Sequence, residues 1–170
     1  FGLNALFTDL EIPNRKTVFS EPPFPKEFGL TMASRQDYML PLFLTDSGLM
    51  NRQTAIWAGF GVTDTTHLGV SGDILRKIFG EVKNSIDKIK ARGGQVIFVR
   101  TPASGAFEYT TKITHPRTKY WNELLVYCNV NGIHYEDNPL TAGFICPEWS
   151  HLSAADAILY TKALVKDLQN

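Results

Sequence analysis

The segment from Cys146 to Ser153 holds residues whose types and spacing fit acid–base chemistry. Its sequence is Cys-Pro-Glu-Trp-Ser-His-Leu-Ser, with Glu148 three residues before His151. A histidine can take a proton from a nucleophilic hydroxyl, and a nearby carboxylate can orient its ring and stabilise its protonated form. The spacing therefore predicts an acid–histidine pair of the hydrolase type. The open alternative is that His151 simply precedes a helix and packs on Trp149.

Regular elements must position this segment. Residues 71–92 carry apolar side chains at mostly four-residue spacing, which predicts an amphipathic helix that ends at Gly93-Gly94. The apolar stripe consists of Ile74, Ile78, Val82, Ile86 and Ile89. The run 95–100 (QVIFVR) is short, β-branched and apolar, which predicts a strand buried on both faces. Helix, two glycines and buried strand make half of a βαβ unit.

The same order of elements then repeats. Thr118 can cap a helix that ends at Asn131-Gly132, and residues 133–136 follow as a short strand. Ser153-Ala-Ala-Asp156 is a capping box in its aspartate form and predicts a terminal helix. Its expected apolar residues are Ile158, Leu159, Leu164 and Val165. Alternating helices and buried strands predict an α/β fold with a mainly parallel sheet.

Ligands of such sheets bind beyond the carboxyl ends of the strands. The loops expected to meet there are 100–105, 137–143 and 146–151. They contain three residues expected to bind substrate, which are Arg100, Ser104 and Trp149. Arg100 can hold an acyl or anionic group, or it can pair with an acid such as Asp137. Ser104 can also be a nucleophile in a different catalytic arrangement, or it can be an ordinary turn residue.

The terminal block resembles a known family. Glu148-x-x-His151-Leu152-Ser153, then Asp156-Ala157 and a final helix, is similar to the last block of the SGNH (GDSL-type) hydrolases. The stretch GGQVIFVRTP (93–102) is similar to a late central strand of that family. The resemblance covers roughly residues 70–170, with Glu148 where the family usually has Asp. It implies a flavodoxin-like, three-layer α/β/α fold.

The resemblance also implies a function. We expect ester hydrolysis or acyl transfer through a serine, with His151 as the general base and Glu148 as its acid. It implies a small-molecule or carbohydrate ester as substrate, no cofactor, and an extracytoplasmic bacterial setting.

The nucleophile is harder to find in the sequence. The nearest match to the Gly-Asp-Ser block of the family is Thr45-Asp46-Ser47-Gly48-Leu49, after the apolar run 39–44. In this interpretation the apolar run is the strand that precedes the nucleophile Ser47. The alternative is that Ser47 belongs to a polar turn. Between Ser47 and Gln95 there is no Gly-x-Asn block and no room for two βα units of about 30 residues each. The serine is therefore expected upstream of this chain or on another chain.

The chain begins with Phe1 and shows few strands, so we expect the C-terminal part of a longer protein. Residues 1–70, rich in proline and scattered aromatics, are expected to be an irregular lid or insertion. Residues 71–170 are expected to be the C-terminal half of a hydrolase-like domain whose sheet another polypeptide completes. The alternative is a non-catalytic binding subunit on the same scaffold, without a nucleophile.

Composition excludes several other classes. The chain has 170 residues, with 17 Lys and Arg against 17 Asp and Glu, so its formal net charge is zero. A neutral chain gives no electrostatic reason to expect nucleic acid as a partner. No stretch approaches the ~18 apolar residues of a membrane span. The two cysteines, Cys128 and Cys146, are expected to be buried free thiols rather than a bridge.

The other histidines give no metal signal. His67, His115 and His134 could join His151, but their spacing matches no standard ligand set. No metal is therefore expected.

Overall fold

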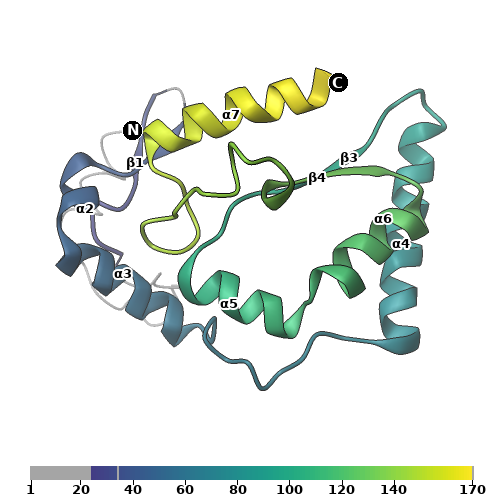
Figure 1. The fold of residues 1–170 in the computed structure, drawn as a ribbon, viewed down its shortest axis with the longest axis horizontal. Coiled ribbons are helices and arrows are strands. Elements are labelled where there is room, and N and C mark those ends of the chain that lie inside the picture. Colours follow the sequence, from purple (N-terminus) through teal and green to yellow (C-terminus); the bar gives the residue numbers. More distant parts are fainter. Residues whose placement is uncertain (1–23, 34, 170) are drawn as a thin grey trace, which may run out of the picture.

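The computed structural model describes residues 24–33 and 35–169, and this part of the chain is a mixed α/β fold (Figure 1). Its centre is a parallel pair of strands, β3 (Ile97–Arg100) and β4 (Asn131–His134). Helix α7 (Ala154–Gln169) lies on one side of this pair in Figure 1. The helices between the two strands lie on the other side, α5 (Gly105–Thr114) and α6 (Glu123–Cys128).

Strand β4 starts two residues before the predicted strand 133–136. Asn129 takes a left-handed conformation (φ 50°) and ends α6, so the chain is extended from Asn131 onward. A Cβ on Gly132 would lie 2.7 Å from side-chain atoms of Leu125 and Trp121, so the glycine lets β4 approach the helix side. The pair Asn131-Gly132 therefore belongs to the strand rather than to the end of the helix. The second half of the predicted strand, residues 135 and 136, lies in the 3-10 turn Tyr135–Asp137.

The second predicted helix forms, but it is not capped by Thr118 and its first turn is not α-helical. Residues Thr118–Asn122 form a π-helical turn that continues into α6. Thr118 is the first residue of that turn and Arg117 occupies the cap position, without a side-chain capping hydrogen bond. The prediction that Thr118 caps the helix is therefore wrong.

The prediction that residues 95–100 are buried on both faces is wrong for the described part of the molecule. Ile97 and Val99 are 40% and 39% exposed. The cause is the size of the sheet: in the described residues β3 pairs with β4 alone, and a two-stranded parallel sheet leaves its other edge open.

Helix α4 (Gly72–Lys90) confirms the helix predicted over 71–92, but of the predicted apolar stripe only Ile86 is buried. The buried side chains are Leu75, Phe79 and Ile86, whereas Ile74 is 62% exposed. The helix packs beside α6, so the side that faces α6 decides which residues are covered.

Helix α7 starts as its capping box predicts. The Asp156 backbone N–H donates to the Ser153 hydroxyl at 3.1 Å, and that hydroxyl contacts the Asp156 carboxylate at 2.8 Å. The predicted apolar face is again only partly covered. Tyr160 is buried, but Ile158 and Leu159 are exposed.

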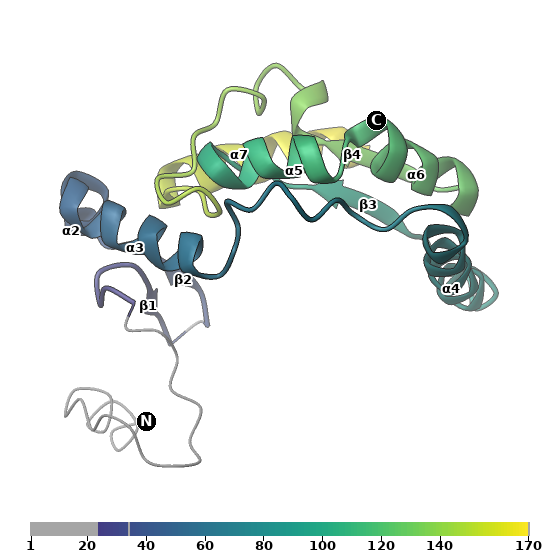
Figure 2. The ribbon, with the colours of Figure 1, turned by 90° about the horizontal axis from the view of Figure 1, so that it is seen from below.

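The first half of the chain is more regular than predicted. It contains helix α2 (Pro41–Thr45), helix α3 (Ser47–Gly59) and a small antiparallel pair, β1 (Leu30–Thr31) with β2 (Asp37–Tyr38). These elements lie at the opposite end of the molecule from α4 (Figure 2). The apolar run 39–44 is therefore not a strand, because Pro41 starts α2 inside it. Residues 1–23 of the expected lid lie outside the described residues.

Two further expectations concern composition. Cys128 and Cys146 are both free and buried, as predicted, and burial raises the pKa of the Cys146 thiol to about 11. No helix in the described part of the chain is long and apolar enough to cross a membrane.

Candidate acid–base site

The segment that carries the predicted pair is braced against the loop after β3. The Ser104 backbone N–H donates to the Trp149 carbonyl at 2.9 Å, and the Cys146 backbone N–H donates to the Ser104 hydroxyl at 2.9 Å. Trp149 has a left-handed backbone (φ 82°) and its ring covers Gly105, where a Cβ would overlap the indole. Two of the three predicted loops, 100–105 and 146–151, therefore meet. Ser104 and Trp149 hold them together.

Glu148 is the buried member of the pair, with a side chain that is 0% exposed. Its Oε1 accepts hydrogen bonds from the backbone N–H of Ser150 (3.1 Å) and from the backbone N–H of His151. Its Oε2 accepts from the Trp57 indole N–H and from the Ser150 hydroxyl (2.9 Å). A buried carboxylate held by several donors is fixed in one orientation.

His151 meets this carboxylate at the distance that the sequence interpretation requires. Its Nδ1 lies 3.0 Å from Glu148 Oε1, and its side chain is 60% exposed. The ring stands edge-on to Phe28, with centroids 5.7 Å apart, and lines a cavity of about 970 Å³. With Nδ1–H turned to the carboxylate, Nε2 is the nitrogen left to accept a proton. The alternative, a histidine that only packs on Trp149, does not describe this geometry.

The charges of the two groups support each other. Burial alone would raise the pKa of Glu148, but hydrogen bonds from His151 and Trp57 outweigh it and hold that pKa below its usual value. The hydrogen bond to Glu148 raises the pKa of His151 above its usual value, although burial opposes this. The pair therefore favours an imidazolium beside a carboxylate, the state that follows proton uptake by a general base.

Ser47 does not join this pair in the structure. It is the first residue of α3, where the Asp46 carboxylate accepts hydrogen bonds from the Gly48 and Leu49 backbone N–H groups. The Asp-Ser step is therefore a helix cap rather than a turn after a strand. Ser47 is not among the residues that line the His151 cavity, and its hydroxyl makes no hydrogen bond within the described part of the chain.

Trp57 is the residue of the site that the sequence analysis missed. It lies on α3, 91 residues before Glu148. No local spacing links Trp57 to Glu148. The sequence offered only the general expectation that the N–H of a covered tryptophan needs a hydrogen-bond acceptor.

Arg100 lies elsewhere. The structure pairs Asp137 with Arg117 instead, through contacts of 2.8 and 2.6 Å, so the predicted alternative of an Arg100–Asp137 pair is wrong. The Arg100 side chain makes no hydrogen bond or ion pair with a described residue. It lines a second cavity of about 400 Å³, together with His134. Its expected role in binding an anionic group stays a prediction.

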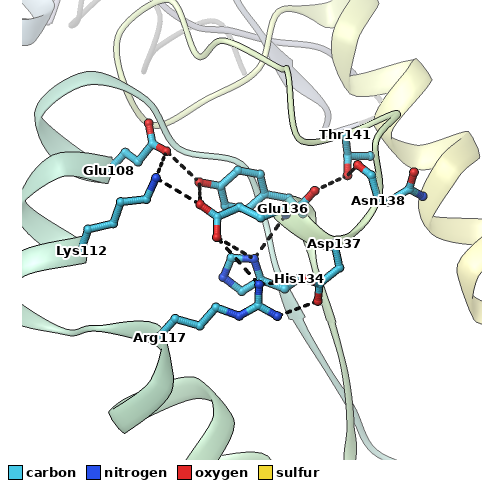
Figure 3. Close-up of polar contacts among 9 residues, drawn as sticks. Glu108, Lys112, Arg117, His134, Glu136, Asp137, Asn138 and Thr141 are labelled. Carbon is cyan, nitrogen blue, oxygen red and sulfur yellow. Dashed lines mark hydrogen bonds and ion pairs between the residues drawn. The ribbon is translucent and has the colours of Figure 1, made fainter.

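The residues beside this second cavity form a charged cluster (Figure 3). Lys112 bridges Glu108 (2.6 Å) and Glu136 (3.1 Å), and Arg117 holds Asp137. The chain from 135 to 141 is tied by the Thr141 hydroxyl, which donates to the Tyr135 carbonyl. These charges satisfy one another, so the cluster fastens α5 to the loop after β4. The predicted loop 137–143 is bound to α7 instead, since Asn138 donates to Asp167.

The remaining histidines stay apart from His151. His67 pairs with Asp64 at 2.6 Å, His115 contacts Thr114, and His134 stacks on Tyr135. Among residues 24–33 and 35–169, no group of three or more potential ligands could hold a metal ion.

No protein-family model matches the chain, and no curated protein or solved structure gives a significant match. The function is therefore inferred from the site itself.

Proposed function

We propose that this chain supplies the acid–base pair of an SGNH-type serine esterase or acyltransferase. The observation that carries the proposal is the geometry of one pair. Glu148 is fully buried and holds Nδ1 of His151, while the half-exposed ring lines a large cavity. An acid withdrawn from water and a histidine open to ligand are what a general base needs.

The chemistry follows from the free nitrogen. His151 Nε2 takes the proton from a serine hydroxyl as its oxygen attacks the ester carbonyl, and Glu148 stabilises the imidazolium. When the bond between the carbonyl carbon and the leaving oxygen breaks, the imidazolium returns the proton to the leaving alcohol. Water or a second alcohol then takes the acyl group from the serine, giving hydrolysis or transfer.

The serine itself comes from outside the described residues in this proposal. Among the described residues, the hydroxyl that lies within hydrogen-bond distance of the ring is Ser150 Oγ, 2.8 Å from Nδ1 on the Glu148 side and away from the nitrogen that must act. The open edge of β3 and the exposed Ile97 and Val99 suit further strands from another polypeptide segment. Helices on two sides of β3 and β4 are in keeping with a flavodoxin-like, three-layer sheet.

The first half of the chain then forms part of the cover of the site. The segment from Phe24 to Met39 lines the same cavity as His151, with Phe24, Phe28 and Tyr38. Its aromatic walls suit the acyl or alcohol part of an ester, whether of a small molecule or of a carbohydrate.

The test measures hydrolysis of p-nitrophenyl acetate by the complete protein, meaning this chain with any polypeptide that completes its sheet. His151→Ala should lower turnover by ~10³ or more while the thermal unfolding temperature falls by no more than about 3 °C. His67→Ala is the matched control, because His67 also follows an acid by three residues. Equal turnover in His151→Ala and the parent would contradict the proposal. Failure of a fluorophosphonate probe to label any serine would favour the non-catalytic binding subunit.

A further inference from the structure

The Glu148 carboxylate receives hydrogen bonds from two parts of the molecule. Its own segment supplies the backbone N–H groups of Ser150 and His151 and the Ser150 hydroxyl. The other donor is the indole N–H of Trp57, which reaches Oε2 from α3. The orientation of the acid is therefore set partly by a helix that is distant in sequence.

Of the two donors to Oε2, the Trp57 indole N–H contacts this oxygen alone, whereas the Ser150 hydroxyl has other acceptors within reach. An indole N–H can only donate, whereas a serine hydroxyl has a single proton to give. Ser150 Oγ lies within reach of Oε1 (3.1 Å), Oε2 (2.9 Å) and His151 Nδ1 (2.8 Å), so it can serve only one of them at a time. With Oε2 engaged by the indole, Oε1 faces the histidine.

The indole is held in place by other aromatic rings. Its centroid lies 5.5 Å from that of Phe24, 6.0 Å from that of Phe107 and 6.3 Å from that of Phe28. Phe28 also contacts His151, so a single aromatic cluster touches Trp57 and the base. This packing keeps water away from Glu148, which strengthens each hydrogen bond that the carboxylate accepts.

We propose that Trp57 is a positioning residue for the Glu148–His151 pair. Its N–H fixes the carboxylate so that Oε1 is presented to His151, and it couples the segment 24–60 to the base. This inference uses the proposed function only for its rate measurement, since the contact itself can be tested by titration.

The expected electrical consequence has a definite direction. A donor to the carboxylate favours its charged form, so loss of the indole N–H should raise the pKa of Glu148. The loss also releases the carboxylate from the orientation that presents Oε1 to Nδ1, so the hydrogen bond that raises the pKa of His151 weakens and that pKa should fall. The other charged side chains that line the cavity are Lys26 and Asp37.

The first experiment compares Trp57→Phe with the parent by NMR titration of the His151 ring in the complete protein. Phenylalanine keeps an aromatic ring and removes the donor. We expect His151 to titrate at lower pH, and kcat to fall roughly tenfold with little change in KM, because a hydrogen bond to a charged group is lost. Trp121→Phe is the control, since Trp121 packs on His134 and should leave His151 unchanged. An unchanged His151 titration in Trp57→Phe would overturn the proposal.

A second measurement needs no substitution and remains available if Trp57→Phe does not fold. The indole N–H signal of Trp57 should shift as Glu148 is protonated at low pH, while that of Trp121 stays constant. A Trp57 signal that ignores this titration would contradict the proposal. If the signal shifts but the parent hydrolyses no ester, the positioning contact stands and the proposed function fails.

Discussion

The chain contains two acid–histidine pairs with the same spacing, and they differ in burial and in the contacts they make with distant residues. Glu148 and His151 are joined at 3.0 Å, and Asp64 and His67 are joined at 2.6 Å, both through Nδ1. The Glu148 side chain is 0% exposed, whereas that of Asp64 is 36% exposed. His67 is 89% exposed, and His151 lines a cavity that His67 does not touch.

The difference shows that an acid and a histidine in local contact are not enough to make a candidate active site. At Asp64 the hydroxyl and backbone N–H of Thr66, and then His67, lower the pKa of the acid to about 2, all within a short surface turn. At Glu148 a residue from α3 adds a donor, and burial removes water. Hydrogen bonds in a site without water are stronger and hold one geometry. The charged cluster of Figure 3 is a second example of polar groups in contact that do not form a candidate acid–base site. Its acidic and basic side chains pair with one another.

After loss of His151 itself, the largest loss of turnover is expected when the acid of the buried pair is replaced. Glu148→Gln should lower turnover roughly 10²-fold, because the amide can no longer stabilise the imidazolium. Asp64→Asn should leave turnover unchanged, because its pair is exposed and lies outside the cavity. Equal loss of activity in Glu148→Gln and Asp64→Asn in the ester assay would contradict the claim that only the buried pair takes part in catalysis.

A smaller effect tests how the segment around Glu148 is held. Gly105→Ala should cost roughly 2 kcal/mol of stability, since the φ of Gly105 is +54° and a Cβ there would overlap the Trp149 ring. Gly72→Ala is the matched control, with a φ of +60° and open space around the Cβ. Urea unfolding of both variants separates the two costs. Equal losses would show that Trp149 does not brace the segment.

The smallest effect concerns pH. The pKa of His151 is raised, so its contribution to stability is complete below its ordinary value of 6.5 and is lost as the pH rises through the raised pKa. The pKa of Glu148 is lowered, so its contribution is complete above 4.5 and is lost as the pH falls through the lowered pKa.

The unfolding temperature of the parent should therefore exceed that of His151→Ala most between pH 4.5 and 6.5, by about 1–3 °C, and less above that range. Melting curves at several pH values measure this difference. The effect is small because the ring is more than half exposed. A difference that grows steadily toward pH 9 would contradict the assignment of the ion pair.

Elements governed by neighbouring residues could be predicted from the sequence. The periodicity over 71–92 predicted α4, and Ser153 with Asp156 predicted the start of α7. The faces of these helices could not be predicted, because burial depends on what packs against them. Ile74 and Ile158 belong to predicted apolar faces and lie exposed. Helix α3 was missed because its apolar residues form no clear stripe, although Asp46 caps it.

The sequence by itself determined that an acid lies three residues from a histidine at two places, since a turn of that length brings their side chains together. It also determined that a strand and a helix flank the later pair. Only the tertiary structure decided which pair is withdrawn from water, because the donor Trp57 lies on α3 and its aromatic neighbours Phe24 and Phe107 lie on two other segments. No local spacing connects Trp57 or Phe24 to Glu148. Burial and long-range hydrogen bonds depend on the whole packed chain, and they distinguish a candidate site from a surface turn.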